Sequence, residues 1–361
     1  MRIGYLHLGN HKHGVVRFGK QIASGLKQSA NIHVYEWSLD EWHSSVIKSI
    51  NNIDILHCQY NAQVYSSIWG RLFRQNLNLN ELFNLVKIPV VFTIHDIYRP
   101  GYIAEANLFK FSDWLKMQIA PQRFALKKII DNASNIIVNS EEEATRLVQL
   151  NSTKSPCIVH LYIEQRELKE SKINAKLHLG LENKKIILIL GYIHPRKGHD
   201  LVIEAMRYLP KEYYLIVAGD AVPSQRDYKN TLIDSINTFA LSDRVRITGY
   251  LTDSDLEIVL TATDLAVVPC RNVSASASLN TVISAGIPVI AADLPFFHEY
   301  NSIVGNSITI LPKFDSYYLA KMVQEIPLKD DKIKKRLVAL KNHLSIESTT
   351  QRYLDIYQES I

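Results

Sequence analysis

Short apolar runs alternate with helix-like segments along almost the whole chain. Near-continuous apolar runs of this kind are typical of parallel strands that helices cover on both faces. The first series of expected strands is Arg2–Leu6, Asn31–Tyr35, Ile53–Cys58, Pro89–Ile94 and Asn135–Asn139. The second series is Ile186–Leu190, Tyr214–Ala218, Val245–Thr248, Leu265–Val268, Val289–Ala291 and Ile308–Leu311. The pattern predicts an α/β protein with two doubly wound domains.

Two amphipathic helices support this division. Leu201, Ala205 and Leu209 recur at a spacing of four and define one buried helix face. The chain from about Ser348 also has a helical pattern, and the residues on its apolar side are Tyr353, Ile356 and Tyr357. We expect a first domain at residues 1–165, a second at 166–345 and a closing helix at 346–361. The charge-rich segment Glu164–Lys176 has no strand pattern, and we predict that it is the linker and the hinge.

The composition fits two soluble domains. The chain has 361 residues, of which 47% are hydrophobic and 21% charged, and that length exceeds one usual core. It contains no apolar run of about 18 residues, and its start, MRIGYLHLGN, has no basic region followed by an apolar one. We therefore expect a cytoplasmic protein. Cys58, Cys157 and Cys270 are far apart, which favours reduced thiols. The net charge of +5 is too small to indicate nucleic-acid binding.

The stretch Val267–Asp293 is a candidate anion site. It passes from an apolar strand through a loop rich in Ser and Ala into a helix-like segment and another strand. The first amides of a helix lack internal partners and carry partial positive charge, so small side chains there let a phosphate approach the backbone. The alternative is an ordinary βαβ turn in which Ser274, Ser276 and Ser278 only cap the helix.

Ligands of open parallel sheets bind beyond the carboxyl ends of the strands. Arg196 and Lys197 follow one expected strand and precede a helix, a position that suits a diphosphate. A solvated charged turn is the alternative. His95 and Asp96 end another strand, where a histidine faces a ligand or is satisfied by nearby backbone.

No motif indicates a metal site. His11 and His13 lie in the loop Gly9–Gly14 without a nearby acidic or cysteine partner, which is more typical of solvated loop residues than of ligands. Asp253 and Asp255 resemble a metal-binding DxD pair, but they precede an apolar helix and fit better as its N-cap and first-turn acids. The chain also lacks a Walker loop and the motifs G-x-G-x-x-G and G-x-S-x-G.

Four ordered segments resemble the carboxyl domain of the family-four retaining glycosyltransferases, which have the GT-B fold. They read GYIHPRKGHDLVIEA, YYLIVAGD, DRVRITGYLTDSDLEIVLTATDLAVVPCR and, after the Ser-rich loop, GIPVIAADLPFFHE. The amino half resembles the family more loosely, through the Gly9–Gly14 loop, IDILHCQY, FTIHD and ASNIIVNSEEE. In that fold two Rossmann-like domains, one binding the acceptor and one the nucleotide sugar, face a central cleft, and the final helix packs on the amino domain.

The resemblance implies transfer of a sugar from a UDP- or GDP-sugar donor with retention at the anomeric carbon. Such chemistry needs cations and N–H donors at the leaving diphosphate. By resemblance His95, Arg196 and Lys197 are catalytic. The implied donor-binding residues are Gly14, Tyr250, Ser276, Ala277, Ser278, Leu279, Asn280 and Thr281. The resemblance implies no metal and no cofactor, since side chains and a helix dipole neutralise the leaving group.

The chain departs from the family at two positions. The family has two glutamates separated by seven residues, and counting back from Gly286 places Val273 and Thr281 there. Neither side chain accepts hydrogen bonds as a carboxylate does, although Thr281 and Asn280 have groups that bond a ribose hydroxyl. A branch of the family with a similar Ser-rich loop favours altered donor contacts over lost activity.

Three functions remain open at this point. The leading one is a glycosyltransferase acting on a saccharide or lipid-linked acceptor in surface polysaccharide or glycolipid biosynthesis. The alternatives are a catalytically silent subunit that binds the nucleotide sugar or stabilises a partner, and a sugar-nucleotide epimerase. Ile68–Asn76 and Leu108–Lys128 combine aromatic and basic residues, a pattern found in segments that touch an anionic membrane surface and also in core-facing helices with a basic outer side. Neither nucleic acid nor a spanning helix is expected.

Overall fold

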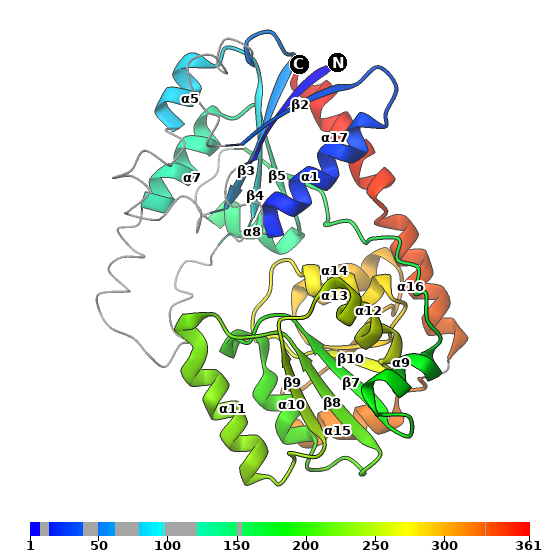
Figure 1. The fold of residues 1–361 in the computed structure, drawn as a ribbon. Helices are drawn as coiled ribbons and strands as arrows, with labels where there is room; N and C mark the ends of the chain where they lie inside the picture. The colour runs from blue at the N-terminus through cyan, green and yellow to red at the C-terminus, as the bar shows by residue number, and fades with distance from the viewer. Residues whose placement is uncertain are drawn as a thin grey trace. The chain divides into compact units, whose positions relative to one another are not determined.

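The structure is a computed structural model of the chain. It describes residues 1–7, 14–38, 50–61, 79–95, 97, 121–149, 154–328 and 330–361. The chain divides into two compact units: one contains residues 1–161 and 346–361, the other residues 162–345 (Figure 1). Each unit holds one six-stranded sheet in which the paired strands run parallel. The α/β class predicted from the sequence is confirmed.

The first unit has the strand order β2-β1-β3-β4-β5-β6. All five strands expected in the amino half are present, while β6, only two residues long, was too short to show a pattern. Its elements are β1 (Arg2–His7), α1 (Gly14–Lys27), β2 (His33–Ser38), β3 (Ile55–Asn61), α5 (Leu79–Leu85), β4 (Val90–His95), α7 (Pro121–Asn132), β5 (Asn135–Val138), α8 (Glu141–Gln149), β6 (Cys157–Ile158) and α17 (Ile346–Ser360).

The two faces of this sheet differ in chemistry because side chains alternate along a strand. Leu56, Cys58 and Tyr60 of β3 join an apolar core with residues of α5, α7 and α8. His57 and Gln59 point to the opposite face, where α1 and α17 pack against each other (Figure 1). The apolar side predicted for the closing helix is buried there: Tyr353, Ile356 and Tyr357 are all buried.

The second unit has the strand order β12-β11-β10-β7-β8-β9. All six strands expected here are present. Its elements are α9 (Lys172–Leu179), β7 (Lys185–Leu190), α10 (His199–Ala205), β8 (Tyr213–Ala218), α11 (Arg226–Thr238), β9 (Val245–Gly249), α12 (Asp253–Ala262), β10 (Leu265–Val268), α13 (Ala277–Ser284), β11 (Val289–Ala292), α14 (Pro295–Ile303), β12 (Thr309–Leu311), α15 (Ser316–Glu325) and α16 (Asp331–His343), with short 3-10 helices at Pro195–Lys197 and Pro223–Gln225.

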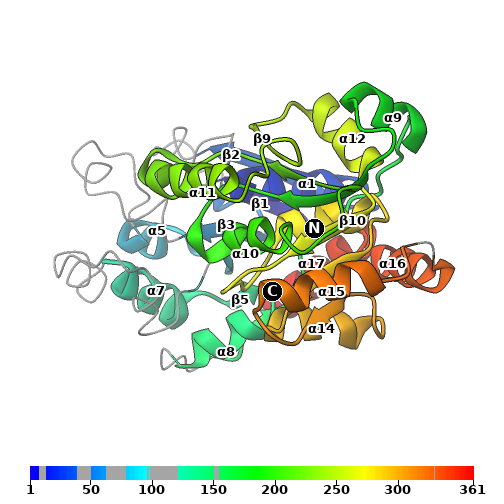
Figure 2. The same ribbon diagram turned by 90° about the horizontal axis from the view of Figure 1, so that it is seen from below.

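Both faces of the second sheet are apolar, which explains its near-continuous hydrophobic strands. Ile186 and Leu188 of β7 pack in one core with residues of α9, α12, α13, α14 and α16. Ile187 and Ile189 pack on the other face with α10, α11 and α15, and α10 contacts both of its neighbours (Figure 2). The central strands β7, β8 and β10 therefore supply alternate side chains to two separate cores.

Three local expectations need correction. The helix predicted to include Leu209 ends at Ala205; Leu209 is buried in the turn that follows. The expected linker Glu164–Lys176 is partly helical, because α9 begins at Lys172 with Ser171 as its N-cap. The cap of α12 is Thr252 rather than an aspartate, whereas Asp253 and Asp255 lie in the first turn as predicted. The acids thus serve the helix dipole.

The cysteines and the helices can also be compared with the sequence predictions. Cys58 and Cys270 are buried, Cys157 is half-buried, and all three are free thiols, as expected. None of the helices in the described ranges is long and apolar enough to cross a bilayer. His11, His13, Asp96, Ile68–Asn76 and most of Leu108–Lys128 lie outside the described residues.

Candidate nucleotide-sugar site in the second unit

The strand order of the second unit defines where a ligand is expected. β7 is the first strand of the unit, and it lies between β8 and β10. The chain winds outward in opposite directions from this point, and in open parallel sheets such a switch point, beyond the carboxyl ends of the strands, is where a ligand is expected. Arg196 and Lys197 lie in the loop after β7, and the Ser-rich segment before α13 lies in the loop after β10. The two candidate anion-binding motifs therefore share one edge of the sheet.

The Ser-rich loop ends in a capped helix. Ser276 is the N-cap of α13, and its hydroxyl oxygen accepts a hydrogen bond from the amide of Leu279 at 3.2 Å. The hydroxyls of Ser276 and Ser278 lie 3.2 Å apart. Ser274 and Ser276 are both buried. The helix capping that we gave as the alternative is therefore present, and it uses the backbone amide of Leu279, one of the residues expected to bind the donor.

Lys197 reaches this helix start from the other loop. Its ammonium nitrogen donates a hydrogen bond to the Ser278 hydroxyl at 3.3 Å, and only 8% of the residue is exposed. Arg196 extends toward Tyr192 instead: its guanidinium donates to the Tyr192 hydroxyl and lies 5.5 Å from the centre of that ring. A buried lysine ammonium and the positive end of a helix dipole converge at Ser278, which is an arrangement suited to an anion.

Glycines let the two loops approach closely. Gly198 has a φ of +70°, and a Cβ atom there would lie 2.0 Å from the carbonyl oxygen of Pro269. Gly191, at the end of β7, has a φ of +124°, and its Cβ would lie 3.7 Å from both the Lys197 ammonium and the Ser278 hydroxyl. Only glycine adopts these conformations readily, so both loop conformations favour glycine, and at Gly198 the close approach to Pro269 also leaves no room for a side chain.

His194 holds the turn that carries the two cations. Its Nδ1 atom accepts a hydrogen bond from the amide of Arg196 at 3.1 Å, which makes it the N-cap of the 3-10 helix Pro195–Lys197. Burial, followed by the charges of Arg196 and Lys197, lowers the pKa of His194 to about 4. The imidazole is therefore neutral at physiological pH, as an acceptor at Nδ1 must be.

A second ion pair joins the same loops. Arg271 follows β10 and makes a two-pronged contact with Asp200 of α10, at 2.9 Å and 2.6 Å. Sequence reasoning missed both residues. Arg271 comes shortly after β10, so the rule that ligands bind beyond the carboxyl ends of strands could have indicated it, whereas no local pattern in the sequence indicates Asp200. Their pairing depends on the approach of two loops that are far apart in sequence.

Other predicted residues have different surroundings. The Asn280 amide donates to the Tyr162 carbonyl at 3.1 Å and accepts from the buried Tyr300 hydroxyl at 2.9 Å, so it ties α13 to its neighbours. Thr281 donates to the Ala277 carbonyl within the helix, and Val273 is buried in the core. Tyr250 follows β9 and is 86% exposed. Asn280 and Thr281 therefore already use, in hydrogen bonds within the protein, the side-chain groups that we expected to bond a ribose hydroxyl.

Two predicted residues belong to the first unit. His95 is the last residue of β4, it is buried, and its ring makes an edge contact with Phe18 at 5.8 Å between centres. Gly14 is the first residue of α1; it is exposed, and a Cβ atom added there would meet nothing within 4 Å. His95 thus lies at the carboxyl end of a strand and Gly14 at the start of a helix, and the roles of both toward a donor remain predictions.

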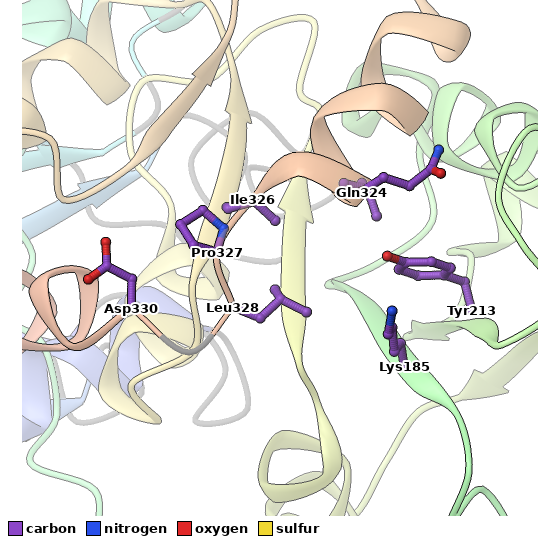
Figure 3. Close-up of a pocket in the computed structure, with 8 residues that line it drawn as sticks. Lys185, Tyr213, Gln324, Ile326, Pro327, Leu328 and Asp330 are labelled. Atoms are coloured by element: carbon purple, nitrogen blue, oxygen red, sulfur yellow. The ribbon is translucent and has the colours of Figure 1, made fainter.

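A surface hollow of about 480 Å³ lies elsewhere in the second unit (Figure 3). Lys185 and Tyr213, the first residues of β7 and β8, line it together with Pro327 and Asp330. It is therefore at the amino ends of the strands, opposite the edge that carries Lys197. Among the described residues no cluster of three His, Cys, Asp or Glu side chains has the arrangement of a metal site, and metal independence stays a prediction.

Comparison with known proteins agrees with this geometry. Residues 170–338 match the model of the family "Glycosyl transferases group 1". This segment belongs to that family. It contains both loops of the candidate site, Arg196 with Lys197 and the Ser-rich start of α13.

Curated relatives match over the same half of the chain. The D-inositol 3-phosphate glycosyltransferase of Mycobacteroides abscessus is 29% identical over 170 residues, which are 46% of this chain and 38% of the relative. Its counterpart in Mycolicibacterium smegmatis is 31% identical over 46% of this chain and 39% of the relative. The matched segment thus spans less than half the length of these relatives.

Solved structures match the whole chain. Anabaena Alr3699/HepE, crystallised with UDP and glucose, has a TM-score of 0.74 at 17% identity, with 99% of this chain and 100% of that one covered. Sucrose-phosphate synthase of Thermosynechococcus elongatus has a TM-score of 0.71 at 18% identity, covering 99% and 98%. These likenesses show the fold, and the GT-B fold predicted from the sequence is confirmed.

Proposed function

We propose that the chain is a retaining glycosyltransferase that moves a sugar from a nucleoside-diphosphate donor to a saccharide or lipid-linked acceptor. The observation that carries the proposal is the contact between the Lys197 ammonium and Ser278 at the start of α13. It places a cation and a helix N-terminus together at the switch point of a group 1 glycosyltransferase segment.

The chemistry of the reaction explains why such a site is needed. Cleavage of the anomeric bond leaves negative charge on the departing diphosphate and positive charge on the sugar. Fixed donors aimed at the developing phosphate charge lower the barrier, because they need no reorganisation during the reaction. In our proposal the ammonium of Lys197 and the guanidinium of Arg196 bind the diphosphate. The Ala277 and Ser278 amides bind it as well, since the Leu279 amide is already bonded to Ser276.

UDP is the first donor nucleotide to test. Anabaena HepE, a structural neighbour, was crystallised with UDP, with UDP-glucose, and with UDP and glucose. The acceptor is less defined: the curated relatives are D-inositol 3-phosphate glycosyltransferases, which supports inclusion of polyol phosphates beside saccharides. His95, Gly14 and Tyr250 keep their proposed roles toward the donor. We also propose a cytoplasmic location, with peripheral contact at the inner membrane face for a lipid-linked acceptor.

Titration and turnover test the proposal. UDP and GDP are titrated by calorimetry, and release of nucleotide is then measured for a panel of UDP- and GDP-sugars with candidate acceptors. Binding of one diphosphate together with acceptor-dependent release supports the proposal, and NMR of the product gives the anomeric configuration. If no donor is bound or turned over, the proposal is wrong.

A second candidate function is a subunit that binds a nucleotide sugar without transferring it. Val273 and Thr281 favour it, because neither supplies the carboxylate that the family resemblance led us to expect, and Val273 is buried in the core. This candidate predicts diphosphate binding without turnover, and rescue of a partner enzyme on mixing. Acceptor-dependent product formation by the chain alone would exclude it.

A further inference from the structure

The ion pair of Arg271 with Asp200 lies where four elements meet. Arg271 comes from the loop after β10, and Asp200 from the first turn of α10. The hydroxyl of Tyr228, on α11, donates to the same carboxylate at 2.8 Å. The guanidinium also lies 4.6 Å from the ring centre of Phe314, in the segment between β12 and α15. A planar guanidinium suits this role, since it stacks on a ring and forms two parallel hydrogen bonds at once.

Arg271 also holds the loop that carries the two cations. Its amide donates to the Arg196 carbonyl at 2.8 Å, and its Nη1 atom donates to the Pro195 carbonyl at 2.7 Å. Gly198, one residue beyond Lys197, lies directly against Pro269 of the same loop as Arg271. Backbone and side-chain contacts from one loop therefore fix both ends of the turn Pro195–Lys197.

The pair is charged in the folded protein. Burial acts to raise the pKa of Asp200, but hydrogen bonds from Arg271 and Tyr228 outweigh it and lower that pKa. The hydrogen bond with Asp200 in turn raises the pKa of Arg271. Both guanidinium Nη atoms are bonded to protein oxygens, so Arg271 differs from Lys197, which ends at a serine hydroxyl beside the helix start.

We propose that Arg271 and Asp200 are positioning residues for the diphosphate site. Their two-pronged ion pair holds the turn Pro195–Lys197 in place, so that the Lys197 ammonium stays at the start of α13. The inference rests on the proposed function, because it assigns the pair to the same site. Neither residue touches the nucleotide in this arrangement. The pair acts through the backbone of Pro195 and Arg196.

Two conservative substitutions test it. Arg271→Lys keeps the positive charge but cannot form the two parallel hydrogen bonds to Asp200. Asp200→Asn keeps the shape of the side chain but removes its negative charge. UDP affinity is measured by calorimetry, and affinity for uridine, which has no phosphate, by ligand-detected NMR. We expect UDP binding to weaken roughly tenfold in both variants, since small displacements of an oriented group cost about that much or more. Uridine binding should not change.

Asp264→Asn is the matched control. Asp264 is another partly buried carboxylate of this unit, and it bonds to Lys172, to Lys176 and to the amide of Ile186. It directly precedes β10 and bonds to the amino end of β7, at the edge of the sheet opposite the candidate site. The control should lower the thermal midpoint of unfolding without changing UDP affinity, which separates loss of stability from loss of positioning.

The outcomes are distinct. Loss of UDP affinity with unchanged uridine affinity in the folded variants supports the inference, and Asp200→Asn alone suffices if Arg271→Lys does not fold. Equal weakening of UDP and uridine would show a general structural role and overturn it. It would also be overturned if Arg271→Lys binds UDP normally while Arg271→Ala does not, because charge alone would then explain the effect. A wild-type chain that binds no nucleotide would overturn the proposed function as well.

Discussion

Lys197 is the residue whose surroundings best define the candidate site. It is almost fully buried, and its ammonium meets a serine hydroxyl at a helix start rather than a carboxylate. A cation in this position adds to the partial charge of the helix dipole, and a bound diphosphate would neutralise both. The structure thus gives Lys197 a specific place, whereas the sequence pattern indicated Lys197 and Arg196 equally.

We expect Lys197→Ala to lower turnover roughly a hundredfold to a thousandfold, the usual loss on removal of one donor to developing charge. Steady-state kinetics with the donor identified in the panel measure the effect. Lys185→Ala is the control. Lys185 is an exposed lysine at the amino end of β7, whereas Lys197 lies in the loop after the carboxyl end of that strand. Unchanged turnover in Lys197→Ala would contradict the assignment.

Gly198 makes a second residue-level test possible. In Gly198→Ala, the new Cβ meets both a φ of +70° and the Pro269 carbonyl at 2.0 Å. Gly180 has a nearly equal φ of +68°, with nothing within 4 Å of its Cβ position. Gly180→Ala therefore shows the conformational cost alone, about 1–2 kcal/mol.

Gly198→Ala should lower the free energy of unfolding by more than Gly180→Ala and should also weaken UDP binding, because the turn must move. Urea unfolding and calorimetry give the two quantities. If both variants are destabilised equally and Gly198→Ala still binds UDP normally, the close approach of Gly198 to Pro269 is not needed for UDP binding.

The closing helix α17 is tied to the first sheet through buried polar groups. The His57 ring bonds through Nε2 to Thr93 at 3.1 Å and through Nδ1 to the Tyr357 hydroxyl at 2.8 Å. Tyr5 stacks on this ring, and the Tyr353 hydroxyl bonds to Thr93. A buried network of this kind fixes one arrangement of its elements, because each unmade hydrogen bond is costly in the interior.

This network predicts a dependence of stability on pH. Burial, followed by the nearby His95 and His7, lowers the pKa of His57 to about 3, whereas an unfolded histidine titrates near 6.5. Between these two pKa values the unfolded chain binds more protons at His57 than the folded chain does, so the free energy of unfolding rises with pH. The stability that neutral His57 contributes is therefore lost as the pH falls below about 6.5.

We expect the slope of unfolding free energy between pH 4 and 6 to fall by about 1.4 kcal/mol per pH unit in His57→Gln, because one differential proton is removed. Urea unfolding at several pH values measures it. His33→Gln replaces an exposed histidine of β2 and should change the slope far less. Identical slopes in wild type and His57→Gln would refute the role given to His57.

The two units differ in what they reveal about function. The second unit contains the family match and both anion-binding loops, so a nucleotide that binds there stabilises that unit. All four tryptophans, Trp37, Trp42, Trp69 and Trp114, belong instead to the first. Circular dichroism therefore reports on both units, and tryptophan fluorescence on the first.

UDP at a hundred times its dissociation constant should stabilise the folded protein by about 2.7 kcal/mol. The thermal transition seen by circular dichroism should move upward with UDP concentration. GDP serves as the comparison nucleotide. A transition that no nucleoside diphosphate moves would contradict the proposed donor site.

Removal of metal gives a further test on the whole protein. Because the proposal assigns charge neutralisation to Lys197, Arg196 and the α13 dipole, turnover should be unchanged after dialysis against EDTA. Activity lost on dialysis and restored by Mn²⁺ or Mg²⁺ would show that a divalent ion carries part of that role.

The sequence by itself determined the class of fold, since strand patterns depend on local alternation and on continuous apolar runs. Every strand it predicted exists, in both units, and the missed one, β6, is too short to have a period. The sequence also selected the two loops of the candidate site, because polar and small residues directly after apolar strands are a local signal.

Only the tertiary structure decided what those residues contact. It placed the Lys197 ammonium at the start of α13 and the Arg196 guanidinium against Tyr192. It also showed that the side-chain amide of Asn280 and the backbone amide of Leu279 form hydrogen bonds within the protein. It also paired Arg271 with Asp200. These partners are distant in sequence, and they meet because the strand order places β10 beside β7. Contacts between residues so far apart in sequence produce no periodic pattern of apolar and polar positions. They can therefore be identified only in the assembled sheet.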